Sequence, residues 1–219
     1  MEEKIPVLDI IFVIDATASM DCMVEFFNKR LVSCVRQINE NANSYFRKTK
    51  VRVKIVEFRD LDSKEDFLKI SPLFDATDYD EIDKYAKAMR ASGGKDLIED
   101  GFTALFDALK INDPYDTDEY SYRRHAVLFF SDNETKLPTL DDYPKTVEEF
   151  ASILKDENNK YGIETKELDI IFFTPKETNY SKLASLVKDT IIMKSYGDIG
   201  DGMMGLLWND PYYIMSFIK

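Results

Sequence analysis

Three short oxygen-bearing side chains follow an apolar run near the start of the chain. Asp15, Thr17 and Ser19 alternate with alanines directly after residues 7–14, a run rich in β-branched residues. The amphipathic pattern after Ser19 predicts a helix, so the cluster falls on a strand-to-helix turn. In an open parallel sheet such turns lie at the carboxyl edge, where ligands bind. Carboxylate and hydroxyl oxygens in this arrangement suit a hard divalent cation such as Mg²⁺ or Mn²⁺.

Two later segments place further oxygen ligands after predicted elements. The apolar run 125–130 predicts a central strand, and it is followed at once by Ser131 and Asp132. The loop 93–96 contains two glycines and ends on Asp96, between two predicted helices. Because the carboxyl ends of parallel strands meet at one edge of a sheet, we expect both segments to converge on the first cluster.

Strands and helices alternate along the chain and determine where these side chains lie. Apolar residues recur at helical spacing over 20–45, while 50–58 and 67–74 read as extended segments forming a hairpin at one sheet edge. Further helices are expected over 79–91, from about 99, over 144–159, 180–189 and 203–208, and further strands over 168–174 and 190–194. This order predicts an α/β fold with a mostly parallel central sheet, one antiparallel edge strand and helices on both faces. The strand that ends at Asp15 is expected to be central, because it is apolar on consecutive residues.

Length and charge limit the classes of partner. With 219 residues, of which 44% are hydrophobic, the chain can bury one sizeable core, so a single domain over 1–219 is expected. The 29 basic and 41 acidic residues give a net charge of −12, which disfavours nucleic acid and anionic membrane surfaces as partners. No leader-like segment and no membrane-spanning apolar run are found in the sequence, and a cytoplasmic location is therefore expected.

The spacing of the two cysteines excludes a disulfide between them. Cys22 and Cys34 fall on one predicted helix, where a rise of 1.5 Å per residue separates them by about 18 Å. With a single His in addition, a zinc site of the usual types is nearly excluded.

In the order of these motifs the chain resembles the von Willebrand factor A domain over essentially its whole length. The metal-ion-dependent adhesion site of that family combines a DxSxS or DxTxS motif, a residue from a Gly-Gly loop and a late Asp. Residues 15–20 are similar to the DxTGSM variant of bacterial and alpha-kinase-associated members, and residues 93–100 are similar to their GGGDxPED loop. The resemblance implies a Rossmann-like three-layer fold.

The resemblance also implies a site and a function. Mg²⁺ or Mn²⁺ would be held by Asp15, Thr17, Ser19, Asp96 and Asp132, with Asp15 setting the charge and acting through water. Thr17 and Ser19 would give hydroxyl oxygens, and Asp132 would complete the shell. In the family the sixth position stays open for a carboxylate of a partner protein. The resemblance therefore implies a non-enzymatic, metal-dependent protein-binding module, of the kind that accompanies bacterial signalling or stress-resistance systems.

Two positions depart from the family pattern. Ala18 stands where the variant has Gly, which is a sterically mild change. The third-loop Thr that many members use as a ligand is absent, with Lys95 and Asp96 near its place. Direct ligation by Asp96 would put three carboxylates around one dication and make an acidic partner less favourable, whereas bonding to a metal-bound water would preserve its capture. The sequence is compatible with both arrangements.

Other functions are compatible with the same pattern. Phosphatases of the haloacid-dehalogenase type also begin with an apolar strand ending in Asp and bind magnesium. Their chemistry needs a second Asp two residues on as general acid, and Thr17 occupies that position here. A metal-free, degenerate A-domain scaffold is a further alternative, because the Gly-Gly loop is atypical. In that case Asp15, Thr17 and Ser19 would act only as helix caps.

The remaining polar residues are expected to have structural roles. Glu99 and Asp100 would serve the N-terminus of the helix that follows them. His125 is expected to be a structural or surface residue. The loop 133–144 is long enough to be a variable binding loop at the rim of the site. An acidic turn is expected to be solvated and not metal-binding, and it contains Asp60, Asp62, Glu65 and Asp66.

Overall fold

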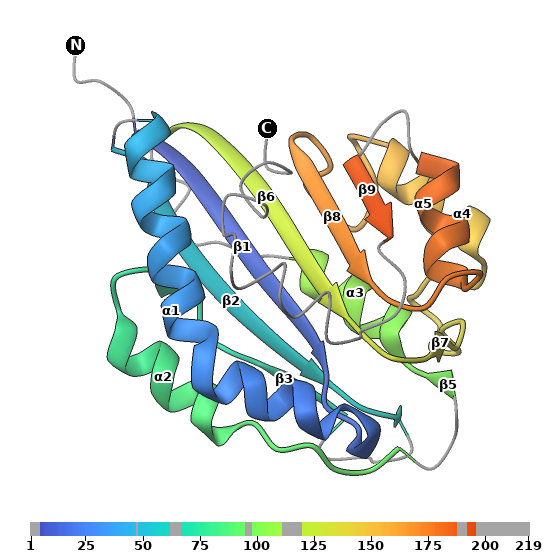
Figure 1. Cartoon of the computed structure of the whole chain (residues 1–219). Helices are drawn as coiled ribbons and strands as arrows, with labels where there is room; N and C mark the ends of the chain where they lie inside the picture. The colour runs from blue at the N-terminus through green and yellow to red at the C-terminus, as the bar shows by residue number, and fades with distance from the viewer. Residues whose placement is uncertain are drawn as a thin grey trace.

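A mixed sheet runs through the part of the chain that the computed structural model describes, which is residues 5–46, 48–61, 67–94, 98–110, 120–187 and 192–195 (Figure 1). Its strands are β1 (Ile5–Asp15), β2 (Lys50–Phe58), β3 (Leu68–Ile70), β4 (Phe74–Asp75), β6 (Tyr120–Phe130), β8 (Leu168–Phe173) and β9 (Ile192–Ser195). The order is β3-β2-β1-β6-β8-β9, and β4 also pairs with β2. The predicted helix 203–208 lies outside the described residues.

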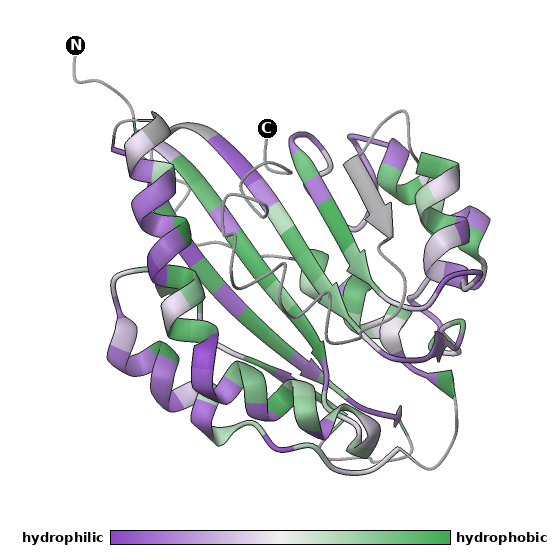
Figure 2. Ribbon diagram, in the orientation of Figure 1, coloured by the Kyte–Doolittle hydropathy of each residue, from purple (hydrophilic) through white to green (hydrophobic). Residues whose placement is uncertain are grey.

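The strand that ends at Asp15 is central, as predicted. β1 pairs in parallel with β2 on one side and with β6 on the other. Ile10 and Phe12 belong to one hydrophobic core, whereas Ile11 and Val13 belong to a second. This double burial explains why the strand is apolar on consecutive residues, as the green colour of the central strands in Figure 2 shows.

The predicted antiparallel edge is also present. β3 and β4 both run antiparallel to β2, and together they occupy the segment for which one extended run was expected. The other pairs of the main sheet, β6 with β8 and β8 with β9, are parallel. The sheet is therefore mostly parallel with an antiparallel edge.

The helices divide between the two cores. The helices α1 (Asp21–Phe46) and α2 (Tyr79–Ala88) contribute to the first core, and the helices α3 (Gly101–Leu109), α4 (Val147–Lys155) and α5 (Asn179–Val187) contribute to the second. A 3-10 turn over Ala18–Met20 precedes α1. The two sets of helices thus cover different residues of the same central strands.

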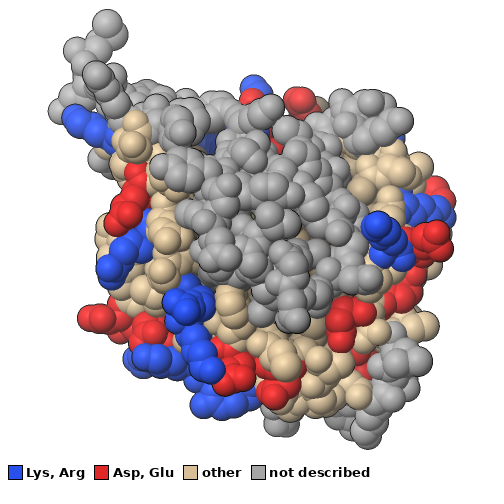
Figure 3. Space-filling view, viewed as in Figure 1, with Lys and Arg blue, Asp and Glu red and all other residues tan. Residues whose placement is uncertain are grey.

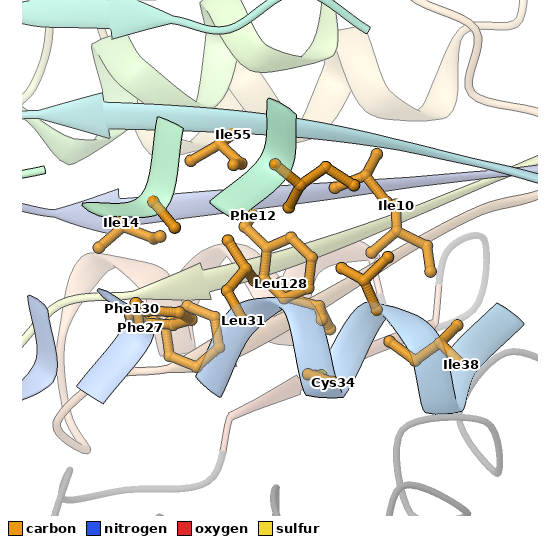
Figure 4. Packing of buried hydrophobic residues seen from close by; sticks show 14 of the residues in the cluster. Ile10, Phe12, Ile14, Phe27, Leu31, Cys34, Ile38, Ile55, Leu128 and Phe130 are labelled. Atoms are coloured by element: carbon orange, nitrogen blue, oxygen red, sulfur yellow. The ribbon is translucent and has the colours of Figure 1, made fainter. Parts of the chain in front are cut away.

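Aromatic packing fixes α1 against the sheet. Phe27 of α1 lies edge-on to Phe130 of β6 and to Phe12 of β1, with ring centroids 5.0 and 6.2 Å away. Figure 4 shows these rings among Leu31, Cys34 and other aliphatic side chains of the first core. Cys34 is buried and Cys22 is exposed, and both thiols are free, as predicted. Rigid packing at this face holds the strand ends in place.

The start of α3 differs from the prediction. The segment Ile98–Glu99 forms a short strand, β5, which pairs in parallel with β7 (Glu134–Thr135), and α3 begins only at Gly101. The amide of Phe102 donates to Thr135 Oγ1 at 2.9 Å, so a residue of β7 accepts a hydrogen bond from a backbone amide in the first turn of α3. Because this contact is tertiary, helical propensity alone does not predict where α3 begins.

The side chain of Asp100 does not cap this helix, and Glu99 belongs to β5. Asp100 occupies the N-cap position, but its side chain makes no capping bond to α3. Its Oδ2 instead accepts from the amide of Leu61 at 2.7 Å, which ties it to the loop after β2.

Two other helices are shorter than predicted. α2 ends at Ala88 because Met89 adopts an extended backbone. α4 begins after Thr146, whose Oγ1 accepts from the amide of Glu149 at 3.0 Å, and it ends where Asp156 becomes extended. Local caps, which the apolar spacing does not report, set these boundaries.

The outer faces of α1 and α2 carry charges of both signs. Figure 3 shows Lys and Arg beside Asp and Glu on this side of the molecule. Lys29 pairs with Glu25, and Lys87 Nζ lies 2.6 Å from Asp83 Oδ2. Within the described ranges, no helix is both long and apolar enough to cross a membrane.

A buried ion network joins the three central strands. Asp9 on β1 is fully buried and accepts from Arg52 Nε at 2.6 Å, from Arg52 Nη2 at 2.8 Å and from Arg123 Nε at 2.9 Å. Asp9 pairs in register with Arg52 of β2 and His125 of β6. His125 is buried with Nε2 3.0 Å from Glu164 Oε2, so its predicted structural role is confirmed.

We predict that Asp9→Asn destabilises the protein by about 3–5 kcal/mol, because it leaves the buried Arg52 without its charge partner. Urea unfolding would measure the loss. Lys29→Ala, which removes an exposed ion pair, is the control and should leave the free energy of unfolding unchanged. A loss below about 1 kcal/mol for Asp9→Asn would show that the network does not hold the strands together.

Candidate metal centre

The side chains of the DxTxS cluster meet at the carboxyl end of β1. Thr17 donates to Asp15 Oδ1 twice, from its amide at 2.9 Å and from Oγ1 at 2.7 Å. Thr17 Oγ1 lies 3.2 Å from Ser19 Oγ. Asp15 and Thr17 are buried, whereas Ser19 is exposed. The cluster therefore has a buried carboxylate at one end and a solvent-facing hydroxyl at the other.

The loop after β6 brings Asp132 to the same cluster. Ser19 Oγ donates to Asp132 Oδ1 at 3.2 Å, and Ser131 Oγ donates to Asp15 Oδ2 at 2.8 Å. Asn133 Nδ2 holds Asp132 Oδ1 from the other side at 2.9 Å. Since β1 and β6 are parallel neighbours, their ends lie at one edge of the sheet, as expected from the sequence.

The Gly-Gly loop packs directly on the DxTxS turn. Ala18 N donates to Gly93 O at 3.2 Å, and Ser92 N donates to Ala16 O at 2.9 Å. Gly94 has a φ of +76°, and a Cβ added to it would stand 2.9 Å from Thr17 Cβ. Glycine is therefore required there by both conformation and space.

Four of the predicted site residues are thus brought together, and these are Asp15, Thr17, Ser19 and Asp132. The fifth, Asp96, lies outside the described residues.

Asp15 carries its charge in an unfavourable setting. Burial raises the pKa of Asp15 from 3.8 to about 6, against the hydrogen bonds from Thr17 and Ser131 that lower it, and Asp132 adds repulsion. Burial also raises the pKa of Glu99, helped by repulsion from Asp15 and by a hydrogen bond with Asp60. A divalent cation at this place would offset the repulsion among these carboxylates.

A second acidic group lies beside the cluster and was missed by the sequence analysis. Glu99, Asp60 and Asp100 are all buried. Lys136 Nζ lies 3.1 Å from Asp60 Oδ1 and 4.0 Å from Asp100 Oδ2. The prediction that Asp60 is solvated is therefore wrong, because Asp60 is buried and its carboxylate pairs with the ammonium of Lys136. The other acids of that turn, at positions 62, 65 and 66, lie outside the described residues.

A weak signal for this group exists in the sequence. Glu99 and Asp100 stand directly before a helix that is almost wholly buried, where two consecutive acids are unusual. No local pattern pairs Asp60 with Lys136, because 76 positions separate them.

The donor set of the cluster fits a hard cation. It consists of two carboxylates and two hydroxyls, all of them oxygen donors of the kind that Mg²⁺ and Mn²⁺ prefer. Among the described residues, no group of three or more His, Cys, Asp or Glu side chains could hold a metal ion. A cation here would therefore depend on hydroxyl and water oxygens, which suits an ion that keeps several waters.

Comparisons with known proteins give the fold alone. No family model and no curated protein matches the chain. The solved structure of proximal thread matrix protein 1 from the mussel byssus, crystal form 2, is similar to it with a TM-score of 0.59 and 13% sequence identity. The similarity covers 99% of this chain and 49% of that one, so this chain spans about half its length.

We predict that Asp15→Asn stabilises the cation-free protein at pH 7. The pKa of Asp15 is about 6 in the folded state and 3.8 in its ordinary range, so folded-state stability is lost as pH rises from about 4 to 6. Asparagine keeps the shape and removes the charge, a gain of at most about 3 kcal/mol.

Urea unfolding in EDTA at pH 4 and pH 7 would measure this effect. The wild type should lose stability relative to Asp15→Asn between the two pH values. Ser131→Ala, which removes a hydrogen bond to Asp15, is the control and should destabilise. An Asp15→Asn variant less stable than wild type at pH 7 would refute the electrostatic account of Asp15.

Proposed function

We propose that this chain is a von Willebrand factor A-type module that binds a partner protein through Mg²⁺ or Mn²⁺. The observation that carries the proposal is the meeting of two strand ends, in which Ser19 Oγ lies 3.2 Å from Asp132 Oδ1 and Ser131 Oγ lies 2.8 Å from Asp15 Oδ2. The similarity of residues 15–20 and 93–100 to the family's motifs supports it independently.

The four residues divide the work of holding the cation. Both carboxylate oxygens of Asp15 accept hydrogen bonds from protein groups, so Asp15 contributes its charge from the buried end of the cluster and orients Thr17. Ser19 and Asp132 stand at the solvent side, where an incoming ligand has access. A bound dication supplies a Lewis acid that a carboxylate of the partner can ligate.

Exposed apolar side chains on neighbouring segments support a partner face. Ile98 is 43% exposed, Leu137 is 38% exposed and Leu140 is 40% exposed. Ile98 lies on β5, which pairs with β7, and the loop that carries Leu137 and Leu140 follows β7 directly. We call these three residues the apolar rim. A partner suited to this face presents an acidic side chain flanked by apolar ones.

A phosphatase of the haloacid-dehalogenase type is the enzyme alternative. The position that such chemistry fills with a general acid is Thr17, whose hydroxyl donates to Asp15 Oδ1 at 2.7 Å. Magnesium-dependent turnover of an aryl phosphate that is lost in Asp15→Asn would favour the enzyme and overturn the binding proposal.

We expect calorimetric titration of the EDTA-treated protein to detect one divalent site. Asp132→Asn should weaken Mg²⁺ and Mn²⁺ binding by about tenfold or more, because it removes a charged oxygen donor. Asp83→Asn on α2 is the matched control and should leave the affinity unchanged. Flat heats for the wild type would instead favour a metal-free scaffold.

We also expect partner capture from cell extract to require both the cation and the apolar rim. EDTA and Asp132→Asn should each abolish capture. The double substitution Leu137→Ala and Leu140→Ala should weaken capture while leaving Mg²⁺ affinity intact, since these side chains carry no oxygen donors. Equal capture with and without chelator would mean that the cation does not bridge to the partner.

A further inference from the structure

A buried acid with one unsatisfied oxygen lies beside the proposed cation site. Glu99 is 1% exposed, and its Oε2 has no hydrogen-bond partner among the described residues. Its backbone is fixed, because Glu99 pairs with Thr135 in the β5–β7 ladder and its carbonyl accepts from Lys136 N at 2.6 Å. A buried polar atom left without a partner costs about 1–3 kcal/mol, so its retention calls for a ligand in the working state of the protein.

The carboxyl of Glu99 faces the DxTxS turn. A Cβ on Gly94 would stand 3.5 Å from Glu99 Oε1 and 2.9 Å from Thr17 Cβ. A side chain at position 94 would therefore contact both Thr17 and the Glu99 carboxyl, which places these two groups close together. Asp15 is near enough to repel Glu99.

The N-terminus of α3 and the ammonium of Lys136 both have partners other than Glu99. The amide of Phe102 at the start of α3 is satisfied by Thr135. The ammonium of Lys136 contacts Asp60 and Asp100, and it is 3.1 Å from the former. Glu99 also shares a hydrogen bond with Asp60 and is attracted by Lys136, but within the described ranges no hydrogen bond reaches its Oε2.

We propose that Glu99 is a further residue of the cation site, where its buried carboxylate lies close to Gly94 and Thr17 and accepts hydrogen bonds from water bound to the cation. The inference rests on the proposed function. Glu99 acts through water, since no group of three acids in the described part of the chain is arranged to ligate one ion directly. Its charge raises cation affinity, so that the cation stays bound when no partner is present.

Magnesium titration of the EDTA-treated full chain tests this role with Glu99→Gln. The variant keeps the size of the side chain, removes its negative charge and can keep the hydrogen bond with Asp60. We expect Mg²⁺ affinity to fall roughly 10–100-fold, the usual effect of removing an outer-shell partner of a metal. The melting temperature of the cation-free variant should be no lower than that of the wild type.

Glu57→Gln is the matched control. Glu57 is also a buried glutamate, but Arg59 Nη2 lies 3.5 Å from its Oε2, so its charge is already balanced. This substitution should leave Mg²⁺ affinity unchanged. Should Glu99→Gln fail to fold, Glu99→Asp provides the same comparison, because it withdraws the carboxylate by one methylene and should weaken Mg²⁺ binding by a smaller factor.

The outcomes separate this inference from the proposed function. Wild-type binding together with equal affinity in the Glu99 variants would overturn the role of Glu99 and leave the module proposal standing. A variant that loses stability in EDTA but keeps its Mg²⁺ affinity would show Glu99 to be structural only. Absence of wild-type binding would overturn both proposals.

Discussion

The parallel pairing of β1 with β6 is the constraint on which the rest of the structure depends. Its register, Ile14 opposite Phe130, brings Asp15 level with Ser131 and allows Ser131 Oγ to reach Asp15 Oδ2 at 2.8 Å. A slip of one residue would exchange the two faces of β1 and separate these oxygens. Asp9 in the same strand disfavours such a slip, since it accepts a hydrogen bond from Arg52 of β2 and lies beside His125 of β6.

The edge of the sheet where these strands end accumulates negative charge away from solvent. Asp15 and Glu99 are buried acids whose pKa values are raised first by burial, then by repulsion from Asp132 in the case of Asp15 and from Asp15 in the case of Glu99. Neutral residues at these two positions would make the fold more stable, because uncompensated buried charge is unfavourable. Strongly perturbed acids gathered at one strand edge are typical of functional sites, and the packed cores on both faces of the sheet offset what they cost.

Much of the fold and the central cluster could be predicted from sequence, because they depend on long, regular patterns. The consecutive apolar residues of β1 predict a central strand, and an acid after each of two such strands predicts that Asp15 and Asp132 share an edge. What could not be predicted depends on short or distant contacts. The β5–β7 ladder joins only Ile98 to Glu134 and Glu99 to Thr135, too few residues to produce a periodic signal. The burial of Asp60 depends on Lys136, to which no local pattern connects it.

We propose that one divalent cation sits where β1 and β6 end. The most direct test is X-ray diffraction at the manganese absorption edge from crystals grown with MnCl₂. We expect an anomalous peak within about 2.5 Å of Ser19 Oγ and of an Asp132 carboxylate oxygen. No peak at this position, or peaks confined to other acidic surfaces, would contradict it.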